Sequence, residues 1–245
     1  TLYAYGVFIT VAFVTTLILA SLKIRKSKTG ISFGNLVDLF FYTVLSAIIG
    51  SRILFVWINF DDFRQNPMQV FKIWEGGLVF YGGLLLAIGV SLWYMRWHRL
   101  PMWKVADLIA PLIALGLFFG RIGCFFAGCC YGKETSLPWG VIFKHPDSLA
   151  PLNIPLHPTQ LYDAANGLAI FFFLNWMEKR KTFEGQLFWL FLFLYAMTRF
   201  FIETLRGDPR GFLFGNLLST SQGIGILLAI FSLFMLFYMK KKNPR

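Results

Sequence analysis

The chain has 245 residues, of which 57% are hydrophobic and only 14% are charged, a balance far from that of a soluble protein. Its net charge of +11 does not indicate a nucleic-acid partner, because the basic residues form short runs between apolar stretches rather than one face. This distribution favours an integral membrane protein.

Seven apolar segments have roughly the 20 residues that a helix needs to cross the hydrocarbon core of a bilayer. The first lacks both a preceding basic stretch and a clear small-residue cleavage site, which argues against a cleaved signal peptide. We therefore predict an all-α integral membrane protein with seven transmembrane helices. Their predicted ranges are 3–22, 35–59, 77–95, 105–130, 160–177, 185–204 and 217–239.

Two connections between these segments have a character of their own. Residues 60–75 are predicted to form a short amphipathic helix in the membrane interface, anchored by Phe71 and Trp74. Residues 131–159 carry five prolines, which predict an extended, turn-rich loop. No compositional break marks a second domain, so residues 1–245 are predicted to form a single transmembrane domain.

The basic residues also predict the orientation of the chain. The connections between the apolar segments, with the C-terminal tail, alternate between rich and poor in basic residues. The rich ones hold 14 Lys and Arg residues, the poor ones hold 6, and three further arginines lie inside the apolar segments. The positive-inside rule places the richer connections in the cytoplasm. The N-terminus is then outside, the C-terminus is cytoplasmic, and the loop 131–159 faces outward.

Three arginines, Arg52, Arg121 and Arg199, lie inside apolar segments. A guanidinium near the bilayer midplane costs roughly 3 kcal/mol on insertion scales, so it normally faces a bundle interior and a polar partner. We therefore predict an anionic ligand, with a lipid phosphate as the favoured one. Glu203 follows Arg199 by one helical turn, and Arg206 extends the positive charge toward the outer surface. The alternatives are a purely structural Arg199–Glu203 ion bridge and an Arg121 bonded only to backbone carbonyls.

Several short motifs resemble one family. The stretch GRIGCFFAGCCYG (residues 120–132) resembles the fourth-helix signature of the prolipoprotein diacylglyceryl transferases, in which Gly-Arg-Ile/Leu-Gly-Asn precedes a short apolar run ending in glycine. Six further motifs are similar to the family's in the same order and extend over essentially the whole chain. They are Tyr5-Gly6, Gly50-Ser51-Arg52, Phe80-Tyr81-Gly82-Gly83, His157-Pro158-Thr159-Gln160-Leu161-Tyr162, Tyr195 with Arg199 and Glu203, and Ser221-Gln222-Gly223.

This resemblance implies an enzyme of the bacterial cytoplasmic (inner) membrane with its active site toward the outer side. It would transfer the diacylglyceryl group of phosphatidylglycerol to the lipobox cysteine thiol of a preprolipoprotein, forming a thioether and releasing glycerol phosphate. Membrane lipids are further expected partners, and no cofactor is expected. Two alternatives stay open: a divergent relative that uses another acceptor with cysteine participation, and a non-enzymatic lipid-binding or transport protein. A transporter is expected to show inverted repeats, and the sequence has none that we detect.

The motif match also assigns residues. Arg121 and Arg199 correspond to the family's essential arginines and would bind the phosphate, while Glu203 would orient an arginine. Glycines in the third segment would permit close passage of the lipid. The predicted substrate-binding residues are Tyr5, Arg52, Gly82, Gly83, Asp107, Cys124, Gly132, Gln160, Tyr195 and Arg206.

The chain departs from the family pattern at two positions. Tyr81 stands where the family usually has a histidine that is often discussed as the base, and Cys124 stands where it has asparagine. A phenol with the ordinary pKa of about 10 is a poor base at neutral pH. His157 is the alternative proton acceptor, since an imidazole ordinarily titrates near pH 6.5, although it can equally serve as a loop cap. Tyr81 and His157 are therefore both predicted as catalytic residues.

The three cysteines of the chain fall within seven residues, at Cys124, Cys129 and Cys130. Their spacing matches no common zinc or iron–sulfur pattern, and no second Cys/His pair completes one. On a regular helix, Cys124 and Cys129 are not at a good distance for a disulfide. We therefore predict small buried thiols and no metal site.

The predicted orientation can be tested with a cysteine placed at Lys144, in a background that has serine at Cys124, Cys129 and Cys130. We expect a membrane-impermeant maleimide to label Lys144→Cys from outside intact cells, because the loop faces outward. Lys241→Cys is the matched cytoplasmic control and should react only after permeabilisation. Labelling of Lys144→Cys only from the cytoplasmic side would overturn the orientation.

Overall fold

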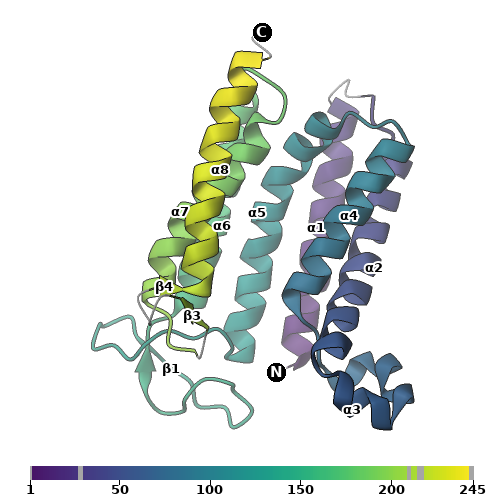
Figure 1. Ribbon diagram of the computed structural model, residues 1–245. Helices are drawn as coiled ribbons and strands as arrows, with labels where there is room; N and C mark the ends of the chain where they lie inside the picture. Colours follow the sequence, from purple (N-terminus) through teal and green to yellow (C-terminus); the bar gives the residue numbers. More distant parts are fainter. Residues whose placement is uncertain (1, 27–29, 209–210, 214–217, 243–245) are drawn as a thin grey trace. The chain divides into compact units, whose positions relative to one another are not determined.

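The structure is a computed structural model that describes residues 2–26, 30–208, 211–213 and 218–242. Within these residues the chain is largely helical, and each of the seven predicted segments coincides with one long helix (Figure 1). The α-helices are α1 (Leu2–Lys26), α2 (Phe33–Ile58), α3 (Phe60–Gln65), α4 (Phe80–Trp97), α5 (Met102–Ala127), α6 (Thr159–Glu178), α7 (Gln186–Thr204) and α8 (Thr220–Lys242).

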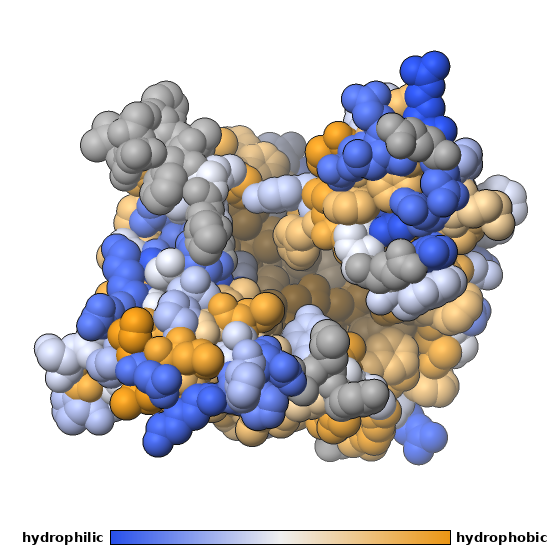
Figure 2. All heavy atoms as spheres, turned by 90° about the horizontal axis from the view of Figure 1, so that it is seen from below, coloured by the Kyte–Doolittle hydropathy of each residue, from blue (hydrophilic) through white to orange (hydrophobic). Residues whose placement is uncertain are grey.

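Five of these helices, α1, α2, α5, α7 and α8, are long and apolar enough to cross a membrane. Apolar side chains also point outward: Leu227 and Phe237 of α8, and Leu85 of α4, are each about 70% exposed, and Figure 2 shows hydrophobic residues at the surface. Such exposure is costly in water and favourable in lipid. The chain is therefore a multi-pass membrane protein. The predicted count of seven crossings requires α4 and α6 to cross the membrane as well, and it stays a prediction.

The chain forms two compact units. One consists of Thr1–Lys23 with Ala106–Arg245, and the other consists of Ile24–Val105. We call them the large unit and the small unit and describe each by itself. The single transmembrane domain over residues 1–245 stays a prediction.

In the small unit, α2 packs along α4 through small residues (Figure 1). A Cβ atom on Gly82 would clash with the Gly50 carbonyl oxygen, and one on Gly83 would lie 2.6 Å from the Ala47 carbonyl oxygen. Small residues are what let two helix backbones approach so closely within a membrane. The predicted passage of lipid at Gly82 and Gly83 stays a prediction, since the structure gives both glycines a role in packing against α2.

The connection between α2 and α4 differs from the predicted amphipathic helix. It is broken into α3 and two short 3₁₀ helices, η1 (Pro67–Phe71) and η2 (Ile73–Glu75). Pro67 contributes to the first break because proline cannot donate a backbone hydrogen bond to a helix in progress. Phe71 and Trp74 are nevertheless 71% and 76% exposed, so both remain available as interfacial anchors.

In the large unit, α6, α7 and α8 lie side by side (Figure 1), and α5 packs against α6. The core joins small residues of α5 to larger ones of α6 and α7, and a Cβ atom on Gly167 would lie only 2.9 Å from the Ala114 carbonyl oxygen. This core comprises Ala110, Ala114, Ile170, Leu174, Leu187 and Phe191.

The loop 131–159 is more ordered than predicted. It holds a two-stranded antiparallel sheet of β1 (Val141–Ile142) and β2 (Pro155–Leu156), and a second small sheet pairs β3 (Phe212–Leu213) with β4 (Leu218–Ser219). The loop is tied to the end of α7, because the Lys133 amide donates to the Leu205 carbonyl at 2.8 Å. These short strands are additions to the all-α prediction and position the loop over the ends of α6 and α7.

The glycine contact in the small unit gives a stability prediction. Gly82→Ala should lower the thermal unfolding midpoint of the detergent-solubilised protein, because overpacking typically costs about 1–3 kcal/mol. Gly89→Ala in the same helix is the matched control, since a Cβ atom there meets nothing within 4 Å. Alanine favours helix over glycine, so Gly89→Ala should leave the midpoint unchanged or raise it. Equal shifts in the same direction would contradict the close α2–α4 contact.

Candidate active site

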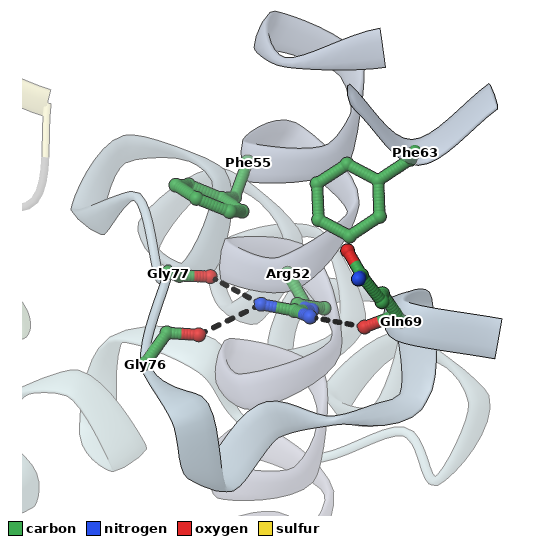
Figure 3. A pocket seen from close by; sticks show the side chains of 6 residues that line it. All are labelled: Arg52, Phe55, Phe63, Gln69, Gly76 and Gly77. Carbon is green, nitrogen blue, oxygen red and sulfur yellow. Dashed lines mark hydrogen bonds between the residues drawn. The ribbon is translucent and has the colours of Figure 1, made fainter. Parts of the chain in front are cut away.

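Arg52 is buried in the small unit, where backbone carbonyls satisfy its guanidinium (Figure 3). Its Nε donates to the Val70 carbonyl at 2.9 Å, and its Nη2 donates to the Gln69 carbonyl at 2.5 Å. Its Nη1 donates to the carbonyls of Gly76 and Gly77, at 2.7 and 3.1 Å. These bonds use four of the five N–H groups that an arginine carries. Arg52 therefore holds the connection between α2 and α4 in place.

Two aromatic rings complete the surroundings of Arg52 (Figure 3). The guanidinium carbon lies 5.5 Å from the centre of the Phe55 ring and 5.3 Å from the centre of the Phe63 ring. Such cation–π contacts stabilise a charge that has left water. The substrate-binding role of Arg52 stays a prediction, since the structure gives this residue a complete structural role.

A different arrangement surrounds Asp163 in the large unit. Its Oδ2 atom accepts a hydrogen bond from Arg199 Nη1 at 2.7 Å and lies 3.3 Å from Arg121 Nε. Arg206 Nη1 is 3.9 Å from the same oxygen. Asp163 is only 4% exposed, so one buried carboxylate on α6 brings together cations from α5, α7 and the segment after α7. We call Asp163 with Arg121, Arg199 and Arg206 the arginine cluster.

Glu203 extends this cluster from the same helix as Arg199. Arg199 Nη2 donates to Glu203 Oε2 at 2.7 Å, and Ser219 Oγ donates to Glu203 Oε1 at 3.2 Å. Both terminal nitrogens of Arg199 are therefore held by carboxylates. The predicted role of Glu203, to orient an arginine, stays a prediction that this contact supports.

Arg206 is buried, with only 1% of its side chain exposed. Its Nε and Nη2 donate to the two carboxylate oxygens of Asp208 at 2.8 and 2.9 Å. Burial alone would lower the pKa of Arg206, but the hydrogen bonds with Asp208 and the Cys130 thiol raise it above its ordinary value. Arg206 is therefore a fixed positive charge.

Several polar atoms of this region lack a hydrogen-bond partner among the described residues. They include Asp163 Oδ1, Arg206 Nη1 and Gln160 Oε1, all of which are buried. Arg121 contacts Asp163 through Nε alone, and no hydrogen bond from its terminal nitrogens is found in the described part of the chain. Buried polar groups are normally paired, so unpaired ones at one place mark a position where a polar group can bind. The two terminal nitrogens of Arg121, which we call its fork, can therefore bind an oxyanion.

Other predicted residues lie around the arginine cluster. Tyr195 interacts electrostatically with Arg121 and Arg199. The Tyr5 ring packs against Gly123, since a Cβ atom there would lie 3.0 Å from Tyr5 Cδ2. Cys124 directly follows Gly123 on α5. Gly132 forms a β-bridge with Arg206. Gln160 Nε2 donates a hydrogen bond to the Cys129 carbonyl at 2.8 Å.

The two candidate proton acceptors fall in different units. His157 belongs to the large unit, where its carbonyl accepts from the Gly132 amide at 3.1 Å and its Nδ1 lies 3.3 Å from the Tyr162 hydroxyl. Trp139 Nε1 in turn donates to that hydroxyl at 2.8 Å. Tyr81 belongs to the small unit and is 45% exposed. No hydrogen bond from its phenol is found in the described residues.

Asp107 has a structural role in the large unit, and its predicted substrate-binding role stays a prediction. It accepts hydrogen bonds from the amides of Gly185, Leu187 and Phe188 at 2.9 to 3.1 Å, and from Lys181 Nζ at 3.2 Å. A carboxylate at this position satisfies amides that the first turn of α7 leaves unpaired. Asp107 is also 14 positions from Arg121 on α5, about 21 Å at the rise of an α-helix.

Sequence reasoning missed Asp163, although a signal for it was present. It is an acidic residue within the apolar segment predicted at 160–177, and such residues are rare in membranes and usually functional. It also shares a buried face of α6 with Gln160 and Gly167, at helical spacing.

Asp163→Asn tests whether the arginine cluster depends on this carboxylate. We expect the free energy of unfolding in detergent to fall by about 3 kcal/mol, because removing one partner leaves buried charges uncompensated. Asp147→Asn is the control, because the Asp147 side chain is 73% exposed, and it should leave the free energy of unfolding unchanged. An Asp163→Asn protein as stable as the unsubstituted one would contradict the central role of Asp163.

Comparison with known proteins identifies the family. Residues 1–238 match the family described as prolipoprotein diacylglyceryl transferase. The chain is 37% identical to a phosphatidylglycerol–prolipoprotein diacylglyceryl transferase of Clostridium tetani, over 96% of this chain and 92% of the relative. It is 35% identical to the enzyme of that name from Aliivibrio fischeri, over 98% of this chain and 84% of the relative. The chain therefore belongs to the prolipoprotein diacylglyceryl transferase family.

Proposed function

We propose that this protein transfers the diacylglyceryl group of phosphatidylglycerol to the lipobox cysteine thiol of a prolipoprotein. The names of its relatives support the donor and the acceptor class. The observation in the structure that carries the proposal is Arg121, a buried cation of the membrane-spanning α5 whose terminal nitrogens are free to bind an oxyanion. A phosphate within the bilayer is the ligand that such an arginine suits.

The reaction defines what the site must do. The acceptor thiol loses its proton, and its sulfur attacks the glyceryl carbon that carries the phosphate oxygen. A carbon–sulfur bond forms, the carbon–oxygen bond breaks, and glycerol phosphate leaves with the electron pair. Negative charge therefore moves from sulfur to the phosphate during the reaction, and fixed cations beside that phosphate stabilise the transition state.

The arginine cluster divides this work among its members. Arg121 offers its fork to the phosphate, since only its Nε is held by Asp163. Arg199 contributes positive charge from a position fixed by Asp163 and Glu203. Arg206 adds a third positive charge beside the Asp163 carboxylate. Because protein groups hold these charges before substrate arrives, little reorganisation is needed during the reaction.

The remaining predicted residues complete the proposal. Tyr5, Gly132, Gln160 and Tyr195 lie near the cluster in the large unit and would line the substrate site. The thiol proton goes to a base, for which the two candidates are the phenolate of Tyr81 and the imidazole of His157. Loss of transfer in Tyr81→Phe but not in His157→Gln would assign it to the tyrosine, and the reverse would assign it to the histidine.

We also propose the setting of the reaction. The protein crosses the bacterial cytoplasmic membrane seven times, with its N-terminus outside and its C-terminus in the cytoplasm. The positive-inside count supports this orientation. The loop 131–159, whose end is tied to α7 next to Arg206, would then place the active site toward the outer side.

The function is tested with the purified protein in vesicles that contain phosphatidylglycerol, using a lipobox peptide as acceptor. We expect a thioether-linked diacylglyceryl peptide and released glycerol phosphate. Arg121→Lys should lower kcat/KM at least about tenfold, because lysine keeps the charge but lacks the fork. Arg64→Lys, at an exposed position of α3, is the matched control and should not change it.

Two outcomes would contradict the proposal. Lipid binding without transfer would favour a lipid-binding protein, and transfer only to another acceptor would favour a divergent relative. Normal turnover of both Arg121→Lys and Arg199→Lys would separately remove the phosphate role from these arginines.

A further inference from the structure

The three cysteines of the chain converge on one point. Helix α5 ends at Ala127, three residues before the end of the predicted segment, because Gly128 takes a left-handed conformation with φ of +69°. The chain then turns back, and the Sγ atoms of Cys124, Cys129 and Cys130 all lie within 4.8 Å of one another. The prediction of no metal site rested on the spacing of the cysteines in the sequence, which does not reveal this turn, and the regular helix assumed for Cys124 and Cys129 ends before Cys129.

Buried hydrogen bonds hold this turn. Cys130 has a φ of +59°, which is uncommon for a residue other than glycine and costs energy. Thr159 Oγ1 donates to the Cys130 carbonyl at 2.9 Å, and Gln160 Nε2 donates to the Cys129 carbonyl at 2.8 Å. Thr159 and Gln160 are both fully buried. The first turn of α6 therefore fixes the backbone that carries Cys129 and Cys130.

The spacing of the sulfur atoms suits a metal ion. A Zn–S bond is about 2.3 Å, which places two sulfur ligands of one ion about 3.8–4.0 Å apart. Each of the three thiols therefore needs to move by less than about 1 Å. Three cysteine ligands with an open fourth position are a known zinc arrangement, and thiolates also select Cu⁺.

The charges around the thiols favour the same conclusion. Metal binding removes the thiol protons, and three thiolates with one Zn²⁺ carry a net charge of −1. Arg206 interacts with Cys130, and Arg121 interacts electrostatically with Cys124. Guanidinium groups so close compensate an anionic metal–thiolate centre that would otherwise be costly to bury.

We propose that Cys124, Cys129 and Cys130 form a binding site for one thiophilic metal ion, Zn²⁺ or Cu⁺. The three thiols release three protons as the three metal–sulfur bonds form, so no oxidant or reductant is required. Zn²⁺ would take a fourth, non-sulfur ligand, whereas Cu⁺ is satisfied by three sulfur atoms. The proposal does not rest on the transfer reaction proposed above, although the two sites share Arg206.

Metal titration of the reduced, chelator-treated full chain in detergent tests this site. We use Cd²⁺ as a spectroscopic substitute for Zn²⁺, and Cu⁺ in a separate anaerobic titration. We expect one ion per chain and a thiolate-to-metal charge-transfer band in the ultraviolet. X-ray absorption then distinguishes the two ions, with three sulfur ligands and one lighter ligand for Zn²⁺ and three sulfur ligands alone for Cu⁺.

Variants connect the binding to the named residues. Each of Cys124→Ser, Cys129→Ser and Cys130→Ser should weaken binding by more than the roughly 10- to 100-fold typical of losing an outer-shell partner. Thr159→Val removes only the hydrogen bond to Cys130 and should weaken binding roughly tenfold. His145→Ala, which removes an exposed imidazole beside Asp147, is the matched control and should not change it.

Three results would overturn the proposal. The first is binding by the triple serine variant as tight as that of the unsubstituted chain. The second is loss of binding in His145→Ala, which would place the ion at the surface. The third is a metal-free protein, purified without reductant, in which only one of the three thiols reacts with a maleimide, because the other two would then form a disulfide.

Discussion

The structure depends on how charge is held inside a membrane. An ionised group in the bilayer core must find partners within the protein, because no water is there to solvate it. Asp163 meets this requirement for the large unit. Its single Oδ2 atom lies within 4 Å of cations from α5, α7 and the following segment, so the geometry of the proposed active site follows from one buried carboxylate.

The same constraint separates structural charges from functional ones. Arg52 and Asp107 are as deeply buried as the arginine cluster, but each is satisfied by its own unit through four hydrogen bonds. Around Asp163, by contrast, Arg121 and Arg206 keep donor nitrogens without a hydrogen-bond partner among the described residues. A buried group that stays unsatisfied costs energy, and a site that binds an anion has a reason to retain it. The embedded charges with unused donors are therefore the ones that can bind an anion.

The thiols lie next to this site and share its cations. Arg206 bonds to Asp208, approaches Asp163 and interacts with Cys130, so the proposed metal site and the proposed phosphate site have one guanidinium in common. Thr159 and Gln160 hold the thiol turn from the first turn of α6, and Asp163 follows one turn later on the same helix. The start of α6 thus positions both sites.

The sequence by itself determined the helices, the membrane class and the family. Runs of about 20 apolar residues have few alternatives to a membrane helix, and ordered motifs such as GRIG identify a family without any structure. Tertiary structure alone decided which polar residues meet. Asp163 lies 36 positions from Arg199 and Asp107 lies 78 from Gly185, and no periodicity within one helix encodes such pairs. The thiol cluster likewise required the turn at Gly128, because three side chains that a continuous helix would separate converge only where the helix ends.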